Sequence, residues 1–172
     1  VSMLKADKVE VVQGEATAKA PDLVVCNGEE YKGRDLVLAN GSRPRQLPSY
    51  PVGGDIVTSD ELLSQPRLPK SLLVVGAGVM GIELAGLYAQ FGVKVRVGDI
   101  LPTLVPTMDE ELSKLLLTSY QKLGIQFELG VPEVKRKDEE LVLVSVGRVN
   151  NIDQAGVPSL KLPVQKGKIQ VD

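Results

Sequence analysis

Blocks of apolar and polar residues divide the chain into predicted strands and helices. Residues 72–75 form a short, continuous apolar run with two valines, which is typical of a buried strand. Residues 82–91 are predicted to form a helix, and residues 94–97 a second strand. A further helix ending near residue 123 and a third strand at 125–129 complete a β-α-β-α-β unit. We therefore expect an α/β fold, namely a Rossmann-like domain with a parallel sheet and flanking helices.

The second predicted helix has clear start and stop signals. Thr107 is expected to cap its first turn, with Glu110 three residues on as in a capping box. Gly124 is a suitable residue just past its end. The helix is predicted to be amphipathic, with an apolar face made of Leu112, Leu115, Leu116, Tyr120 and Leu123.

The N-terminal part of the chain shows weaker, mostly β-type patterns. Residues 1–8 resemble the frayed end of a helix. Turn signals at Pro21-Asp22 and Asn27-Gly28 separate short runs that favour strands. These expected strands cover residues 9–13, 16–18, 23–25, 30–32 and 35–39.

Proline and glycine mark a connector and a domain boundary between residues 44 and 54. Beyond it, Thr58-Ser-Asp60 can cap a short helix at 61–63. Residues 133–140 are almost entirely charged and are predicted to form a solvated link. A strongly β-prone run at 141–146 and a weak one at 168–171 are the last expected strands.

The junction between the first strand and its helix carries the main candidate chemistry. Gly76, Gly78 and Gly81 have the spacing G-x-G-x-x-G. The first glycine allows a sharp turn, the second lets the backbone approach a pyrophosphate, and the third lets the helix pack close to the sheet. Free amide groups and the positive dipole end of the helix would then face the phosphates. The alternative is a simple αβ turn without a ligand.

An acid follows the second strand at the position that a bound ribose would reach. Asp99 lies 23 residues after Gly76, where its carboxylate can accept hydrogen bonds from both ribose hydroxyls. Residues 100–107 contain neither lysine nor arginine, so a 2′-phosphate would meet a carboxylate without an offsetting cation. The sequence therefore predicts NAD rather than NADP. The alternative for Asp99 is an ordinary turn residue at a strand end.

Composition excludes several classes of function. The formal net charge is −2, which gives no electrostatic case for a nucleic acid or acidic membrane as partner, and no apolar run approaches a membrane span. With no histidine, His-based catalysis and His-ligated metal sites are excluded, and no metal site is expected. The single cysteine, Cys26, cannot form an intrachain disulfide and suits a reducing compartment, either the cytoplasm or a mitochondrial or plastid matrix.

Several segments resemble the two-dinucleotide flavoprotein disulfide reductases, and within that family the dihydrolipoamide dehydrogenases. The segments that carry the resemblance are VEVVQGEATA at 9–18, LVLANGSRPRQLP at 36–48, TSDELL at 58–63, PKSLLVVGAGVMGIELA at 69–85, MDEEL at 108–112 and LVLVSVGRVNNID at 141–153. The resemblance implies three parts: residues 1–48 as a partial FAD-domain segment with a β-meander, residues 49–150 as the NAD domain, and residues 151–172 as a return toward the FAD domain.

The resemblance also implies further cofactor-binding residues. Val79 and Met80 stand between the second and third motif glycines, and Glu83 matches a glutamate near the nicotinamide pocket of the family. A first-turn acid that stabilises the helix dipole is an equal alternative for Glu83. Gly147 matches a residue at the nicotinamide end, or is a plain turn. Gly41 follows Asn40, which replaces the threonine that the family usually shows beneath the flavin.

The resemblance implies an activity that this chain alone does not complete. The parent enzyme would pass electrons from dihydrolipoamide through a disulfide and FAD to NAD. It would be a homodimer within a 2-oxo acid dehydrogenase complex. This chain holds no cysteine pair, so no catalytic residue is assigned and we expect NAD binding without full activity. Alternatives are a non-catalytic nucleotide-binding or folding fragment, and the core of a related NADH oxidase or peroxidase.

Overall fold

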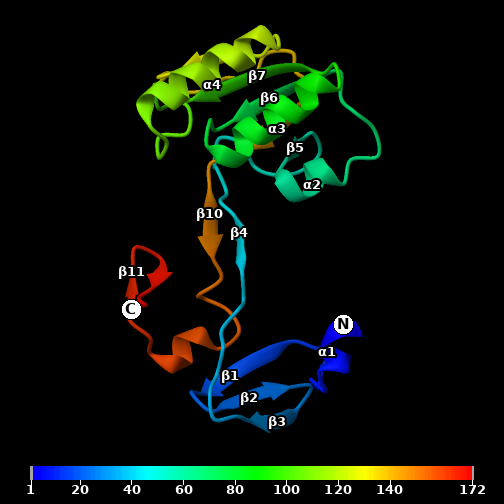
Figure 1. Ribbon diagram of the computed structural model, residues 1–172, viewed down its shortest axis with the longest axis vertical. Helices are drawn as coiled ribbons and strands as arrows, with labels where there is room; N and C mark the ends of the chain where they lie inside the picture. The colour runs from blue at the N-terminus through cyan, green and yellow to red at the C-terminus, as the bar shows by residue number, and fades with distance from the viewer. Residues whose placement is uncertain (1, 172) are drawn as a thin grey trace. The chain divides into compact units, whose positions relative to one another are not determined.

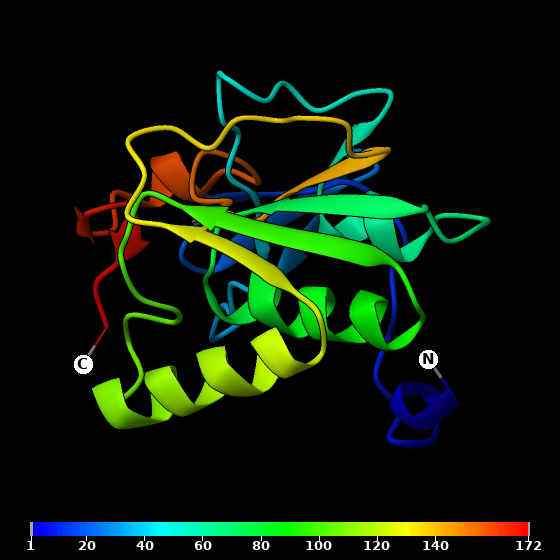
Figure 2. The same ribbon diagram turned by 90° about the horizontal axis from the view of Figure 1, so that it is seen from above.

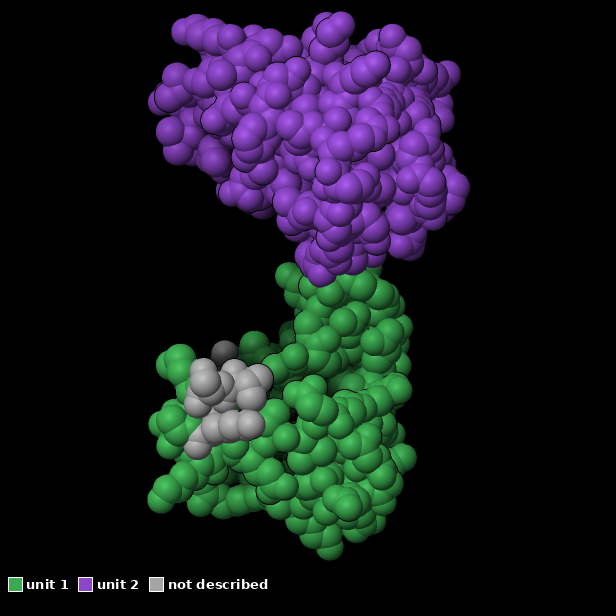
Figure 3. Space-filling view, turned by 90° about the vertical axis from the view of Figure 1, so that its right-hand side faces the viewer, with its two compact units in different colours: residues 1–43, 149–172 green, residues 44–148 purple. Residues whose placement is uncertain are grey.

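The computed structural model describes residues 2–171, which form two compact units coloured in Figure 3. Among the described residues, one unit comprises residues 2–43 and 149–171, and the other residues 44–148. The chain passes between them through two paired strands, β4 (Ser42–Pro44) and β10 (Arg148–Asn150). The assignment of these units to flavin and NAD domains stays a prediction.

Residues 44–148 contain a five-stranded sheet with the order β5-β9-β6-β7-β8 (Figure 1). All four of its strand pairings are parallel. The central strand β6 places Leu72, Leu73 and Val74 at zero exposure, as expected for a strand covered on both faces. The strands are β5 (Ile56–Val57), β6 (Ser71–Val75), β7 (Lys94–Asp99), β8 (Gln126–Leu129) and β9 (Leu141–Val144). The predicted α/β fold with a parallel sheet is confirmed.

The two faces of this sheet are covered in different ways. Helices α3 (Val79–Gln90) and α4 (Glu110–Lys122) lie along one face (Figure 2). Residues 130–140, here called the 130–140 link, run along the other face without regular secondary structure. The main core lies on the helical side, and a smaller one under the link.

Helix α4 differs from its prediction at its start and in its buried face. Asp109, not Thr107, caps the helix, because its carboxylate accepts the amide hydrogen of Glu111 at 2.9 Å. Three leucines of the predicted apolar face are about half-exposed or more: Leu112, Leu115 and Leu123. Leu116 and Tyr120 pack against the core as predicted, and Ser113 and Leu117, which the prediction did not include, complete the inward side. A hydrogen bond from the Ser113 hydroxyl to the Leu104 carbonyl, 2.7 Å long, fixes this rotation.

The short helix α2 (Ser59–Leu63) confirms the predicted cap. The Thr58 side chain accepts a hydrogen bond from the amide of Asp60, and Glu61 reaches back to the Thr58 amide at 2.8 Å. This reciprocal arrangement satisfies amide groups that the first helical turn leaves without partners. Leu62 is thereby held with no exposed surface beside the sheet.

The other unit is built from short elements. A helix α1 (Ser2–Ala6) precedes an antiparallel sheet of β1 (Ala16–Ala20), β2 (Leu23–Cys26) and β3 (Glu29–Lys32). Positive φ angles at Asn27 and Gly28 confirm the predicted hairpin turn. A short 3₁₀ helix (Val157–Leu160) and a hairpin of β11 (Val164–Gln165) and β12 (Lys168–Ile169) follow.

Two strands expected in this unit do not form. Residues 9–13 are fully in the exposed class and have no strand partner among residues 2–171. Residues 35–39 likewise lie outside any sheet, and Val37 is 85% exposed. A β-prone sequence becomes a strand only where a neighbouring backbone can pair with it, and the described chain supplies none at these places.

The expectation that residues 133–140 are merely a solvated link is wrong, because the link carries a buried ion pair. The guanidinium of Arg96, on strand β7, is only 5% exposed and donates to Glu139 at 2.6 Å. It also donates to Glu128 and to the carbonyl of Lys135. Val134 is buried as well, at 6% exposure. The link is thus anchored to the middle of the sheet by both charge and apolar contact.

These contacts predict a loss of stability in acid. Burial alone would raise the pKa of Glu139, but the amide of Lys137 and the guanidinium of Arg96 together hold that pKa below its ordinary value of about 4.5. A hydrogen bond from Lys137 lowers the pKa of Glu128 in the same way. Because the folded pKa values lie below the unfolded ones, the stability from these groups is complete above pH 4.5 or so and is lost as pH falls through the folded values.

We therefore expect the melting temperature to fall progressively between about pH 5 and pH 3. A Glu139→Gln variant should be less stable at neutral pH and should lose less stability on acidification. Thermal unfolding followed by circular dichroism at several pH values measures both effects. Parallel pH curves for the two proteins would show that Glu139 does not contribute to the acid transition.

Candidate functional site

The glycine turn lies where the sequence predicts it, between strand β6 and helix α3. Gly76 has φ +109°, and a Cβ there would stand 2.4 Å from the carbonyl oxygen of Ser145. A Cβ at Gly81 would stand 2.2 Å from the carbonyl oxygen of Gly76. Both distances are far too short for real atoms, so the fold itself requires glycine at these two positions.

Gly78 is different, because nothing within the chain explains it. Its φ is −73°, an ordinary value for any residue, and a Cβ there would have nothing within 4 Å. Gly78 is the N-cap of α3, and no side chain caps this helix. The first amide groups of the helix therefore face open space, as they do where a helix end receives an anion.

Asp99, the last residue of β7, faces the glycine turn. One of its carboxylate oxygens accepts the amide hydrogen of Ala77 at 2.6 Å, and the other accepts that of Leu101 at 2.8 Å. Each carboxylate oxygen can accept a further hydrogen bond, so these contacts orient the group without exhausting it. The amide of Val105 also donates to the Ala77 carbonyl at 2.9 Å, which ties the loop after β7 to the turn.

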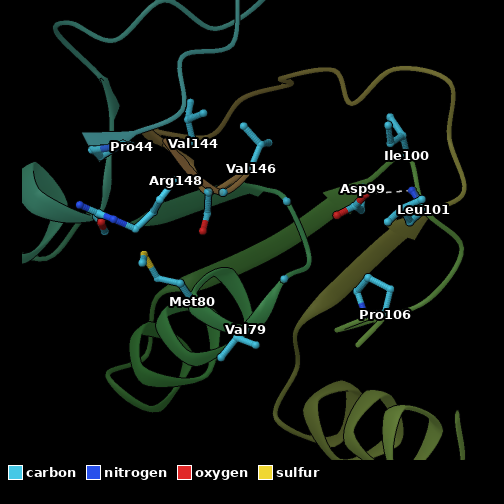
Figure 4. Close-up of a pocket in the computed structure, with 15 residues that line it drawn as sticks. Pro44, Val79, Met80, Asp99, Ile100, Leu101, Pro106, Val144, Val146 and Arg148 are labelled. Carbon is cyan, nitrogen blue, oxygen red and sulfur yellow. Dashed lines mark hydrogen bonds between the residues drawn. The ribbon is translucent and has the colours of Figure 1, made fainter. Parts of the chain in front are cut away.

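A hollow of about 430 Å³, here called the glycine pocket, joins these features. It is elongated: in Figure 4, Asp99 and Leu101 lie at one end, and Met80 and Arg148 at the other. All residues that line it belong to the unit 44–148. Its size is in the range of small-molecule and cofactor sites.

The structure brings most of the predicted site residues together. The glycine pocket is lined by Gly76, Gly78, Val79, Met80, Asp99 and Gly147. Gly81 is buried beneath it, where α3 packs on the turn.

Two predicted residues lie elsewhere. Glu83 is exposed and does not line the pocket. Its alternative interpretation as a first-turn acid is wrong, because α3 begins at Val79 and its first turn contains no acid. Gly41 belongs to the other unit, beside a hollow that Asn40 also lines.

Sequence reasoning missed several residues that line the pocket. Ser145, Val146 and Arg148 follow strand β9, and Ile100 and Leu101 follow β7. The position of these residues just after predicted strands made them candidates, since ligands of parallel α/β sheets bind outside the carboxyl ends of the strands. What the sequence did not supply was the strand order, which places β9 directly beside β6.

Within residues 2–171, no cluster of three or more possible metal-ligating side chains occurs. Among the described helices, none has the length and apolar character needed to cross a membrane.

A parallel sheet with a glycine turn, an uncapped helix end and an acid after the next strand defines an α/β domain of the Rossmann, dinucleotide-binding type. The chain belongs to the pyridine nucleotide-disulphide oxidoreductase family, whose model matches residues 1–172. The resemblance seen in the sequence is confirmed.

Among its relatives are dihydrolipoyl dehydrogenases. That of Bacillus subtilis is 36% identical over 171 aligned positions, which cover 85% of this chain and 36% of the relative. That of Thermus scotoductus is 32% identical over 193 positions, covering 99% of this chain and 42% of the relative. This chain is therefore similar to dihydrolipoyl dehydrogenases but spans only about two fifths of their length.

Solved structures with the same fold include the HOCl-induced flavoprotein disulfide reductase RclA from Escherichia coli. It has a TM-score of 0.83 and 21% identity, and the match covers 97% of this chain and 43% of that one. LpdA from Mycobacterium tuberculosis has a TM-score of 0.82 and 23% identity, with coverage of 96% and 42%. At such identities the likeness establishes the fold alone.

Proposed function

We propose that residues 44–148 bind NAD, as the NAD-binding portion of a dihydrolipoyl-dehydrogenase-like flavoprotein. The observation that carries this proposal is Gly78, a glycine that neither its φ angle nor its neighbours require. An external group that approaches the backbone closely is a physical reason for glycine there. A pyrophosphate beside the uncapped start of α3 is such a group, and its charge suits the helix end.

Each residue of the pocket has a binding role in this proposal. The first amides of α3 would donate to the pyrophosphate, and Asp99 would accept hydrogen bonds from the adenosine ribose. The Ala77 and Leu101 amides hold the Asp99 carboxylate in position before the ligand arrives. Val79, Met80 and Gly147 would contact the cofactor along its length.

The activity of the whole protein is a further part of the proposal. The chain would belong to an enzyme that oxidises dihydrolipoamide with NAD, with FAD and a redox disulfide supplying the electron relay when present. Its similarity to the dihydrolipoyl dehydrogenases of Bacillus subtilis and Thermus scotoductus favours this over an NADH oxidase or peroxidase. A homodimer within a 2-oxo acid dehydrogenase complex, in a reducing compartment, is the expected setting. This chain's own contribution is to bind and orient NAD.

Isothermal titration calorimetry with NAD and NADP tests the site. We expect NAD to bind with a Kd in the micromolar range or weaker, and NADP at least about tenfold more weakly, because its 2′-phosphate would meet Asp99. Asp99→Asn should narrow this difference while retaining one carbonyl oxygen for the Ala77 amide. Circular dichroism serves as the folding control. Equal affinity of the unchanged protein for both dinucleotides would contradict the role given to Asp99.

A folding fragment that associates through its smaller unit is the second candidate. Val9, Val11, Val12 and Val37 are exposed in segments without strand partners among the described residues. Unpaired β-prone segments of this kind can pair with another chain. Gel filtration at several concentrations distinguishes a monomer from such an assembly.

A further inference from the structure

The residue before Asp99 is a buried glycine that its own backbone does not require. Gly98 belongs to strand β7 and has no positive φ. A Cβ at this position would nevertheless stand 2.5 Å from a methyl carbon of Val134, far too close for real atoms. Val134 belongs to the 130–140 link and is itself buried. Glycine at position 98 therefore makes room for the side chain of Val134.

Val134 is held in place by polar contacts on both sides of its own side chain. Its carbonyl accepts the hydroxyl hydrogen of Tyr50 at 3.0 Å, and the next carbonyl, that of Lys135, accepts a hydrogen bond from the Arg96 guanidinium at 2.9 Å. Arg96 and Gly98 are two positions apart on β7, so they belong to the same face of the sheet. The link thus meets this face through charge at Arg96 and through packing at Gly98.

The start of the link is bonded to the residues that surround the candidate acid. The amide of Val131 donates to the backbone carbonyl of Asp99 at 3.3 Å, and the amide of Gly130 donates to that of Leu101 at 2.9 Å. Together with the packing of Val134, these bonds fix the segment from position 98 to position 101 against the link.

The glycine turn holds the same segment. The amide of Gly76 donates to the Gly98 carbonyl at 2.8 Å, and the amide of Ala77 donates to the Asp99 carboxylate at 2.6 Å. Asp99 therefore has two supports, the turn that would bind the pyrophosphate and the 130–140 link. None of the residues that line the glycine pocket belongs to the link, so the link can act on a ligand there only through the segment that it holds.

We propose that Val134 is a positioning residue for Asp99: by packing on Gly98 it fixes the end of β7 and so the direction of the Asp99 carboxylate. This inference rests on the proposed NAD binding and adds to it a residue that sets the preference for NAD over NADP. A fixed carboxylate is ready to accept hydrogen bonds from the ribose hydroxyls and cannot turn away from a 2′-phosphate. A loosened one binds the hydroxyls less well and repels the phosphate less.

Calorimetric titration of the full chain with NAD and NADP tests the proposal through the ratio of the two Kd values. We expect a ratio of at least about tenfold in the unchanged protein and below about threefold in Val134→Ala, chiefly because NAD binds more weakly. Val142→Ala is the matched control: Val142 has no exposed surface, belongs to the same small core and does not line the glycine pocket. It should keep the ratio, and circular dichroism shows that each variant is folded.

Two further variants separate positioning from other effects. Gly98→Ala pushes Val134 away and should narrow the ratio in the same way, so it tests the contact even if Val134→Ala does not fold. Adding Val134→Ala to Asp99→Asn should change the ratio of Asp99→Asn by less than about twofold, because Val134 acts through the carboxylate that asparagine removes. A direct contact of Val134 with the ligand would instead weaken both dinucleotides alike and leave the ratio of Val134→Ala unchanged.

The outcomes distinguish this inference from the function on which it rests. If the unchanged protein binds neither dinucleotide, or both equally, the proposed site is wrong and this inference falls with it. If the preference for NAD is present and survives in a folded Val134→Ala or Gly98→Ala variant, only this inference falls. It also falls if Val142→Ala narrows the ratio as much as Val134→Ala does, since a general loosening of the core would then account for the effect.

Discussion

Replacing Arg96 by methionine is expected to destabilise the unit 44–148 by about 3–5 kcal/mol, because it leaves a buried carboxylate without its cation. Glu139 is 7% exposed and its side chain meets the guanidinium at 2.6 Å. Methionine fills much of the space but donates nothing, so Glu139 must either stay charged in a poorly solvated place or take up a proton. Urea unfolding monitored by circular dichroism gives the change in free energy.

Two further variants make this prediction specific. Lys114→Met removes a cation from an exposed pair with Glu110 on α4 and should cost less than about 1 kcal/mol. Adding Glu139→Gln to Arg96→Met removes the stranded charge while keeping an oxygen for the Lys137 amide, so the double variant should be more stable than Arg96→Met alone. A single-variant loss no larger than that of Lys114→Met would show that the pair is not the anchor of the 130–140 link.

The ion pair between Arg96 and Glu139 could not be predicted from the sequence. Arg96 and Glu139 are separated by 43 positions, and the charged run around Glu139 looks like a solvated loop when taken alone. Burial of a charged side chain depends on a partner, and the partner depends on which strands are neighbours. Local pattern cannot supply that information.

The strand–glycine–helix junction could be predicted because its determinants are local. The strand needs a short β-branched run, the turn needs glycine at Gly76, and helix α3 follows within a few residues. The predicted fold class was confirmed for the same reason, since strands alternating with helices admit few arrangements other than a parallel sheet. The helix did begin three residues before its predicted start, at Val79.

Helix α4 was predicted correctly, but its buried face was predicted only in part, with Leu116 and Tyr120 inward and three leucines exposed. Its leucines are spread so widely around the helix that the sequence allows more than one apolar stripe. Tertiary contacts decide between them: Tyr120 fits against Gly86 of α3, where a Cβ would stand 2.7 Å from its hydroxyl oxygen. The contact of Tyr120 with Gly86 and the hydrogen bond of the Ser113 hydroxyl thus determine which side of α4 is buried. Three leucines remain exposed as a result.

Replacement by alanine should destabilise the protein more at Gly81 than at Gly78. Gly81→Ala is expected to cost about 1–3 kcal/mol of stability, since its methyl group would overlap the Gly76 carbonyl oxygen unless α3 moves away from the turn. Gly78→Ala adds a methyl group to open space and should cost less than about 1 kcal/mol, because alanine is a weaker N-cap than glycine. Urea unfolding of the two variants measures this difference.

The effect of Gly78→Ala on NAD binding should be large, in contrast to its small effect on stability. Gly78→Ala should weaken NAD at least about tenfold, equivalent to about 1.4 kcal/mol, because the methyl group occupies the space proposed for the pyrophosphate. Gly33→Ala is the matched control: Gly33 lacks a positive φ, a Cβ there makes only an ordinary contact at 3.4 Å, and it lies in the other unit. Calorimetric titration with NAD gives the comparison.

The stability and the NAD affinity of Gly78→Ala, measured together, show whether the ligand lies against the start of α3. A stable Gly78→Ala protein with weakened NAD binding places the ligand against this backbone, since the chain itself has no use for the space. A stable variant that binds NAD as well as the unchanged protein would place the pyrophosphate away from Gly78. The proposed contact between the start of α3 and the dinucleotide would then be wrong, even though the Rossmann-type fold remains.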